Sequence, residues 1–255
     1  MAFFKKKYEI DAMCDAGRRL QKVFSEIVFS DLIGKSTLEI DCYIAKLLEK
    51  YLLVSCVKGY KGFPRYSCIS INDELVHGVP KKTVIIKEKD FVKVDICASY
   101  NGFCADACRW YGNILAHDVC KRMVVCADNA LASAIKMCKK GNTIGEIACT
   151  IEDVIIANGY SVVVDFAGHG IGKKMHEDPM VPNFFDKEDH ATMQQKIYPG
   201  MAFAIEPMFC QWKADLLVNQ EDGWTVKTVD GGLAMHIEDT VIVGEHGAIV
   251  TTRLI

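Results

Sequence analysis

The sequence contains no apolar run long enough to cross a membrane. A membrane-spanning helix needs roughly twenty consecutive apolar residues, and no stretch of this chain approaches that length. The lysines at positions 5–7 are also not followed by the apolar segment of a secretory signal. We therefore expect a cytoplasmic protein that does not bind membranes.

An excess of basic residues is absent as well. The chain has 30 Lys and Arg residues against 33 Asp and Glu, which gives a formal net charge of −3 at pH 7. Proteins that bind nucleic acid usually carry a basic patch, so we expect no nucleic-acid partner. No Pro/Ser-rich linker or low-complexity stretch divides the chain, and 50% of its residues are hydrophobic. The composition therefore fits one enzyme-sized domain over residues 1–255 with a large core.

The twelve cysteines do not form the CxxC pairs that are typical of zinc sites and redox motifs. Because the chain has no secretory signal and disulfides are rare in the cytosol, we expect reduced thiols. Cys104 and Cys108 flank Asp106, which is compatible with a zinc site. Further ligands at zinc-site spacing are missing, however, so half-buried packing is the favoured interpretation of these two thiols.

The most informative segment is 168–179, which reads Gly-His-Gly-Ile-Gly-Lys-Lys-Met-His-Glu-Asp-Pro. A helix is disfavoured here, because glycine costs about 1 kcal/mol and proline about 3 kcal/mol in a helix interior. Glycine also lets the backbone approach another group closely. The segment therefore predicts that His169 and His176 are held around a ligand or substrate site.

Four acidic residues lie in strand-like apolar sequence. Asp95 and Asp106 stand on either side of Asn101–Gly102, a dipeptide typical of β-hairpins, so we expect them on paired antiparallel strands. Each acid alone could be a strand-end carboxylate that faces water, since an unpaired carboxylate is costly to bury. Together with one histidine they supply the ligands that two divalent ions bridged by carboxylates and a water require. The candidate ligands are Asp95, Asp106, His169, Glu206 and Glu238.

Two segments of the chain repeat each other at a constant offset. Gly34, Ser36, Glu39, Ile40, Cys42 and Ile44 correspond to Gly141, Thr143, Glu146, Ile147, Cys149 and Ile151. Both segments read as a glycine followed by Ser/Thr-x-x-Glu, a capping box that opens a helix. Each follows another helical segment, at roughly 8–28 and 118–139. The repeat predicts two related halves, roughly 1–110 and 111–255.

These motifs together resemble the type I methionine aminopeptidases of metallopeptidase family M24. The resemblance runs over nearly the whole chain and rests on stretches in family order: 70–80, which contains His77-Gly78, the Asp95/Asp106 pair, 168–179, 199–208, 222–228 and Glu238. It implies an α+β protein with the pita-bread fold. In that fold, two pseudo-symmetric halves each have two helices and antiparallel strands, with the site between them.

The resemblance also implies an activity and a set of site residues. The activity is removal of the N-terminal methionine from nascent proteins and peptides when the second residue is small, by a water that two metal ions activate. The five candidate ligands would hold two divalent ions, Mn, Fe, Co or Zn, with Asp106 and Glu238 bridging. Glu206 would also act as general base, and His77 and His176 would contact the substrate and stabilise the tetrahedral intermediate.

The implied lining of the methionine pocket is Tyr60, Phe63, Cys68, Met175 and Trp224. An apolar slot with aromatic walls and sulfur neighbours suits a flexible thioether, although Tyr60 and Trp224 taken alone could equally be core aromatics. The implied partners are nascent polypeptide N-termini, including those at the ribosome, and the short form of the family implies a monomer.

The chain departs from the family pattern at three places. Met175 stands where an aromatic residue is usual, and Ala107 and Cys108 follow Asp106 where a hydroxyl residue is common, which predicts weaker support for that carboxylate. The segment 236–239, His-Ile-Glu-Asp, replaces the usual Gln-x-Glu-His. Its Glu-Asp pair is closer to the proline-directed relatives, aminopeptidase P and prolidase.

Two alternative functions remain open at the level of sequence. A proline-directed aminopeptidase of the same fold would normally carry a long additional N-terminal domain, whereas only residues 1–76 precede His77 here. A non-catalytic pita-bread protein that binds a partner should have lost metal ligands. This chain keeps all five candidate ligands and both catalytic histidines, which favours the methionine-releasing enzyme.

Overall fold

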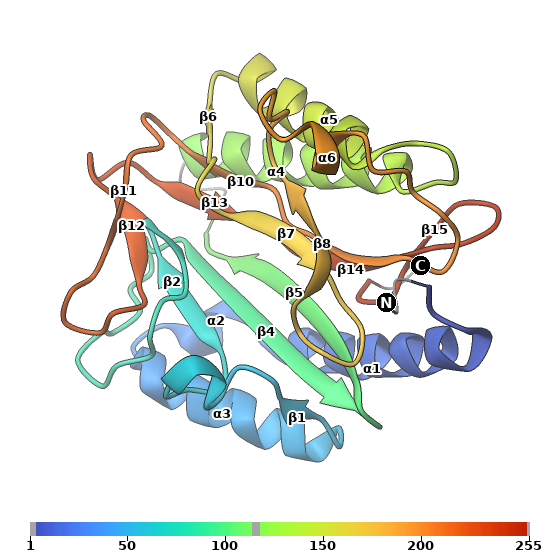
Figure 1. Ribbon diagram of the computed structural model, residues 1–255. Coiled ribbons are helices and arrows are strands. Elements are labelled where there is room, and N and C mark those ends of the chain that lie inside the picture. Colours follow the sequence, from blue (N-terminus) through green and yellow to red (C-terminus); the bar gives the residue numbers. More distant parts are fainter. Residues whose placement is uncertain (1–3, 114–117, 254–255) are drawn as a thin grey trace.

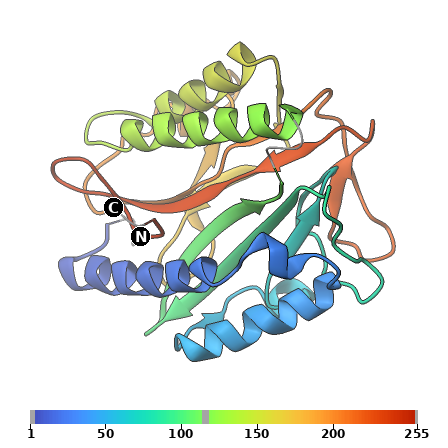
Figure 2. The same cartoon turned by 180° about the vertical axis from the view of Figure 1, so that it is seen from behind.

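The computed structural model describes residues 4–113 and 118–253. Two pairs of long helices lie on opposite sides of the strands in both views, α4 and α5 along one side and α1 and α3 along the other (Figures 1 and 2). The helices are α1 (Lys7–Ser25), α2 (Phe29–Leu32), α3 (Thr37–Lys50), the 3₁₀ turn η1 (Tyr60–Gly62), α4 (Asp118–Met137), α5 (Ile144–Ala157) and α6 (His190–Met193). The α+β class expected from the sequence is therefore confirmed.

The largest sheet has nine strands, all paired antiparallel, in the order β1-β4-β5-β14-β9-β7-β8, with β2 on β4 and β15 on β14. These strands are β1 (Val54–Ser55), β2 (Cys68–Ile71), β4 (Val92–Tyr100), β5 (Phe103–Tyr111), β7 (Ala167–Gly170), β8 (Glu177–Pro182), β9 (Ala202–Ile205), β14 (Glu238–Val243) and β15 (Ala248–Val250). The pairing of β5 with β14 joins the first half of the chain to the second.

Two three-stranded sheets have the orders β13-β10-β6 and β11-β12-β3. Their strands are β3 (Glu74–Val76), β6 (Ser161–Val162), β10 (Met208–Cys210), β11 (Leu216–Val218), β12 (Val226–Thr228) and β13 (Ala234–His236). The strand β3 precedes His77, and β13 ends on His236, so both small sheets deliver a histidine toward the large one.

The hairpin predicted at Asn101–Gly102 joins β4 to β5. Both turn residues have positive φ, 50° at Asn101 and 79° at Gly102, as a two-residue type I′ turn requires. The turn fixes the register, in which Asp95 lies opposite Cys108 and Asp106 lies opposite Cys97. Because side chains alternate along a strand, this register puts both carboxylates on one face of the hairpin.

The predicted repeat appears as matching structure in the two halves. The side chain of Ser36 accepts a hydrogen bond from the backbone N–H of Glu39 at the start of α3, and Thr143 accepts one from Glu146 at the start of α5. The preceding glycines also match, because Gly34 donates its N–H to Ile86 and Gly141 donates to Ile197. Each half therefore anchors its second helix to a later segment in the same way.

Each half has its own buried core. One core packs α1 and α3 against β2, β4 and β5 through residues such as Leu20 and Ile40. The other packs α4 and α5 against β9 and β14 through residues such as Leu131 and Phe203. Among the helices that residues 4–113 and 118–253 form, none combines the length and apolar character that crossing a bilayer requires.

Candidate metal centre and substrate cavity

A cavity of about 990 Å³ opens where the two halves meet. Every site residue expected from the sequence lines it: Tyr60, Phe63, Cys68, His77, Asp95, Asp106, His169, Met175, His176, Glu206, Trp224 and Glu238. They come from segments far apart in the sequence, so their assembly depends on the pairing of β5, β14, β9 and β7.

The four acidic side chains meet because four strands, β4, β5, β14 and β9, lie side by side in the large sheet. Strand β14 lies between β5 and β9, with Glu238 opposite Cys108 and Asp239 opposite Ile205. This places Glu238 between Asp106 on one neighbouring strand and Glu206, which follows the end of the other. Asp106 and Glu238 are 5% and 2% exposed, so their carboxyl groups are almost completely removed from bulk water.

His169 lies on β7 and faces the carboxyl groups. Its Nε2 is 3.6 Å from Glu206 Oε1 and 3.9 Å from Asp106 Oδ2. Its Nδ1 lies 3.0 Å from the carbonyl oxygen of Gly170, an acceptor that fixes the proton on Nδ1. The tautomer that results leaves the lone pair of Nε2 free for a metal ion.

The glycines beside His169 serve the packing of backbones. A Cβ atom at Gly168 would lie 2.4 Å from the carbonyl oxygen of Ala204, and one at Gly170 would lie 2.2 Å from that of Asp178. The close approach expected for segment 168–179 is therefore an approach to the neighbouring strands β8 and β9. The pairing of β7 with β9 places His169 beside Glu206.

The electrostatics of the cluster favour a bound cation. Burial, reinforced by the neighbouring carboxylates, raises the pKa of Asp95 and of Asp106 to about 8. Burial also raises the pKa of Glu206 and Glu238 well above the usual range. Four acids held this close cannot all be ionised without positive charge between them.

The candidate ligand atoms also lie close enough together to share a metal ion, and two of their carboxylates have an oxygen atom without a hydrogen-bond partner among the described residues. Asp106, His169 and Glu238 each offer one atom within 4.8 Å of the others. Asp106 Oδ1 and Glu238 Oε1 are buried and have no hydrogen-bond partner among the described residues. A donor set of carboxylates with one imidazole suits divalent Mn, Fe, Co or Zn, so the residues fit the expected metals.

The two remaining histidines lie at the edge of the carboxylate cluster. The ring of His176 is perpendicular to that of His169, with centroids 4.3 Å apart, and its Nδ1 is 2.9 Å from the hydroxyl oxygen of Tyr60. His77 has a left-handed backbone, with φ of 58°, and lies edge-on to Trp224. Burial lowers the pKa of both histidines, to about 4 for His77, so the neutral forms prevail at pH 7.

An apolar wall stands opposite the acids. Phe63 and Trp224 meet edge to face with ring centroids 5.3 Å apart, and they pack in one cluster with Cys68 and Met175. Cys68 lies opposite Asp95 in the pairing of β2 with β4, so this apolar wall adjoins the four acidic side chains. The cavity can therefore hold an apolar side chain next to a polar reaction centre.

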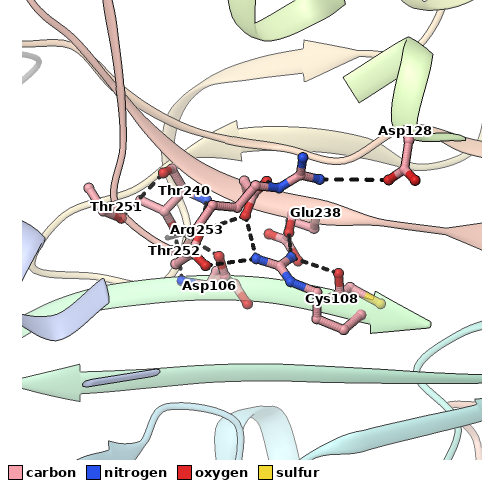
Figure 3. A network of polar contacts seen from close by, with 10 residues as sticks. Asp106, Cys108, Asp128, Glu238, Thr240, Thr251, Thr252 and Arg253 are labelled. Carbon is pink, nitrogen blue, oxygen red and sulfur yellow. Dashed lines mark hydrogen bonds and ion pairs between the residues drawn. The ribbon is translucent and has the colours of Figure 1, made fainter. Parts of the chain in front are cut away.

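The departure at Asp239 has a structural cause. Asp239 is 0% exposed, and its carboxylate contacts the guanidinium groups of Arg109 and Arg253 and accepts a hydrogen bond from Thr252. Figure 3 shows the polar contacts around this position, with Thr252, Arg253 and Glu238 among the labelled residues. Arg109 also donates to the backbone carbonyl of Glu238 at 2.6 Å, so the network holds that candidate ligand in place.

Thr240 on β14 holds the backbone of Asp106, whereas the carboxylate atom Oδ1 has no hydrogen-bond partner among the described residues, in keeping with the weaker support expected for that carboxylate. The hydroxyl of Thr240 accepts a hydrogen bond from the backbone N–H of Asp106 at 2.8 Å and donates one to its carbonyl at 2.9 Å.

The two thiols near Asp106 have different neighbours. Cys104 Sγ lies 3.6 Å from Cys56 Sγ, and Cys108 Sγ lies 3.4 Å from the carbonyl oxygen of His236.

Several residues that line the cavity had been given no role from the sequence, among them Cys97, Phe166 and His236. His236 and Cys97 each lie two residues from a candidate ligand, Glu238 and Asp95. The alternation of side chains along extended chain was therefore a signal for both of them. Phe166 lies in a segment whose direction only the fold determines, and its ring meets that of His77 with centroids 5.7 Å apart.

Comparisons with known proteins agree on one family. The model of metallopeptidase family M24 matches residues 11–245. The chain is 33% identical to a methionine aminopeptidase of Clostridium acetobutylicum over 252 residues, 99% of each chain. It is 32% identical to methionine aminopeptidase 1 of Bacillus subtilis over 256 residues, 100% of each chain.

Solved structures give the same result for the fold. The crystal structure of the methionine aminopeptidase of Thermotoga maritima superposes with a TM-score of 0.91 at 32% identity, covering 100% of both chains. The prolidase of Pyrococcus horikoshii superposes with a TM-score of 0.73 at 21% identity, and this chain covers 65% of it. The second likeness shows a shared fold alone.

Proposed function

The chain belongs to metallopeptidase family M24, and we propose that it removes the N-terminal methionine from nascent proteins and peptides whose second residue is small. The observation that carries this proposal is the joining, in one cavity, of a buried four-acid cluster with His169 and an apolar wall. The full-length relatives named methionine aminopeptidase support the same substrate.

We assign the metal ions to the five residues expected as ligands, which would hold two divalent ions among them. The residues are Asp95, Asp106, His169, Glu206 and Glu238. When bound, two divalent ions lower the pKa of a water molecule between them and polarise the peptide carbonyl. The mixture of carboxylates and imidazole suits Mn, Fe, Co or Zn.

The residues around the centre handle the proton and the developing charge. Glu206 is the general base that takes the proton from the attacking water, and it can return that proton to the leaving amine. His77 and His176 point N–H groups at the oxygen of the scissile carbonyl as it gains negative charge. The contact of Tyr60 with His176 Nδ1 orients that ring, leaving Nε2 toward the substrate.

The apolar wall selects methionine. Five residues surround the space in which the first side chain of the substrate would lie: Tyr60, Phe63, Cys68, Met175 and Trp224. The flexible Met175 in place of an aromatic residue makes this wall more adaptable. A small second residue is required because a larger side chain would collide with the groups around the metal centre.

We further propose the setting in which the enzyme works. Residues 1–255 form a single catalytic domain of two related halves, roughly 1–110 and 111–255, that acts as a cytoplasmic monomer. It meets its substrates as polypeptide N-termini emerging from the ribosome. The proline-directed alternative is less well supported, because the prolidase of Pyrococcus horikoshii shares only the fold with this chain, at 21% identity.

The test is peptide cleavage by purified protein loaded with each metal in turn. Met-Ala-Ser should lose its methionine, whereas Met-Leu-Ser and Ala-Pro-Ser should remain intact. The Glu206→Gln variant, which keeps the shape of the side chain but cannot accept the proton, should release methionine at least about 100-fold more slowly. Cleavage of the proline peptide would support the alternative function, and a protein without metal that cleaves nothing would support the non-catalytic one.

A further inference from the structure

His236 is a buried imidazole that the proposed mechanism does not use. It ends β13, two residues before Glu238, and is 3% exposed. Its Nε2 atom is buried and, within residues 4–113 and 118–253, has no hydrogen-bond partner. A buried polar atom without a partner is costly, so its position calls for a ligand.

The Nε2 atom of His236 points at the carboxylate cluster. It lies 3.4 Å from Glu206 Oε2 and 3.9 Å from Glu238 Oε2. A direct N–H···O hydrogen bond is usually 2.7–3.2 Å long, and this contact is longer. Two ligand atoms that share a metal ion at about 2.1 Å lie about 3.4 Å apart at a tetrahedral angle.

His236 mirrors His169 across Glu206. Each imidazole presents Nε2 to one oxygen of this carboxylate, His169 to Oε1 at 3.6 Å and His236 to Oε2 at 3.4 Å. Each also lies 3.9 Å from a second acid, Asp106 for His169 and Glu238 for His236. The contacts of His236 Nε2 with the carboxylates are therefore as short as those of His169 Nε2.

We propose that His236 is an additional ligand of the metal centre, through Nε2, and that this second imidazole shifts the preference of the centre from Mn toward Zn. Imidazole suits Zn, whereas carboxylate and water ligands suit Mn, so exchanging an oxygen donor for a nitrogen donor moves selectivity in that direction. The inference rests on the proposed metal-dependent function of the same cavity.

The ligand count can be measured without activity. Proton NMR of the Co(II)-loaded protein in H₂O resolves the exchangeable N–H signals of coordinated imidazoles, which the cobalt ion shifts far from the rest of the spectrum. Wild type should show two such signals, and His236→Gln and His169→Gln should each retain one. The exposed His190, on α6, provides the matched control, because His190→Gln should retain both.

Metal affinity gives a second readout. Competition titration should show that His236→Gln loses Zn affinity by at least about 10- to 100-fold, the cost of removing one supporting partner of a metal ligand, with a smaller loss for Mn. One cobalt-shifted signal in wild type, or an unchanged ratio of Zn to Mn affinity in the variant, would overturn the inference.

The two proposals fail separately. A protein that releases methionine but shows a single coordinated imidazole contradicts the role of His236 alone. A protein that shows two coordinated imidazoles but releases no methionine contradicts the proposed function and leaves the ligand assignment standing. The signal count comes from wild type, so it does not depend on whether the His236→Gln variant folds.

Discussion

At the scale of single residues, the network around Asp239 explains a departure from the family pattern. A histidine at this position could not neutralise both Arg109 and Arg253, whereas a carboxylate can. Position 239 therefore affects where Glu238 lies, because Arg109 also binds the backbone carbonyl of Glu238. Its effect on the choice of substrate is smaller. The kinship with proline-directed enzymes that the Glu-Asp pair suggested is thus explained without a change of substrate.

Asp239→Ala should strongly destabilise the protein. Removing one partner of a buried ion pair leaves an uncompensated charge, which costs about 3–5 kcal/mol. Asp128 is a matched control, because it approaches Arg253 only to 4.0 Å and its side chain is 50% exposed. Asp128→Ala should change the free energy of unfolding by about 0–1 kcal/mol. Urea denaturation of both variants measures the difference, and equal losses would show that the network is not what stabilises β14.

His176→Ala should separate catalysis from metal binding. His176 lies beside His169 but is not one of the assigned ligands, so metal content should stay at the wild-type level. Turnover should fall by a factor of about 100 to 1,000, as when one group that stabilises an oxyanion is removed. Metal analysis and peptide hydrolysis test both parts. Loss of metal from the variant would mean that His176 belongs to the ligands.

At the scale of elements, local signals in the sequence predicted the long pieces well. The helices expected at roughly 8–28 and 118–139 are Lys7–Ser25 and Asp118–Met137, and the Asn101–Gly102 hairpin is present. These elements depend on nearby residues, on amphipathic periodicity, caps and turn chemistry. The order of the nine strands depends on pairings between distant segments, which no local signal specifies.

The same limit applies to the site. Residue type and motif marked the ligands, but the orientation of His236 follows from the pairing of β13 with β10, where it lies opposite Met208. Sequence reasoning noticed His236 only as a departure from the family pattern. The close approach at Gly168 was expected, but the neighbouring strand as its partner was not.

The two capping boxes should contribute equally to stability. Ser36→Ala and Thr143→Ala each remove the acceptor for one N–H at the start of α3 or α5, and each should cost about 1 kcal/mol. Ser30→Ala, at an exposed position on α2, is the control and should be nearly neutral. Denaturant titration compares the three variants. A loss confined to one of the two caps would contradict the equivalence of the halves.

At the scale of the whole molecule, the candidate metal centre lies where the two halves meet, and two buried clusters contain residues of both halves. Asp95 and Asp106 come from the first half, and His169, Glu206 and Glu238 from the second. A cation between them would stabilise the junction as well as serve the proposed catalysis. Without metal, several of these buried acids stay uncharged only because they keep their protons.

The metal-free protein should therefore lose stability as the pH rises from 6.5 to 8. Burial raises the pKa of Asp95 and Asp106 to about 8, so the folded state keeps protons that the unfolded state has already released. The free energy of unfolding should fall by about 3 kcal/mol across this range. Burial lowers the pKa of His77, His169 and His236 to about 4, which acts in the opposite sense only between about 4 and their ordinary value of 6.5.

Thermal unfolding after dialysis against a chelator measures this trend. Asp106→Asn removes one titrating group and should flatten the pH dependence. Zinc should reverse it, because the metal binds the deprotonated carboxylates that accumulate as the pH rises. Metal-free protein that becomes more stable between pH 6.5 and 8 would contradict the burial of the acids without counter-charge.

The central place of β14 in the large sheet also governs the order in which the enzyme can become active during its own synthesis. Translation delivers β5 and the acids of the first half long before residues 238–243, the strand that separates β5 from β9. Until then, β5 has an open edge that carries Asp106, and folding as a whole waits for a contact between distant parts of the chain. A growing chain therefore cannot assemble the four-acid cluster, or act on any substrate through it, before β14 has been synthesised.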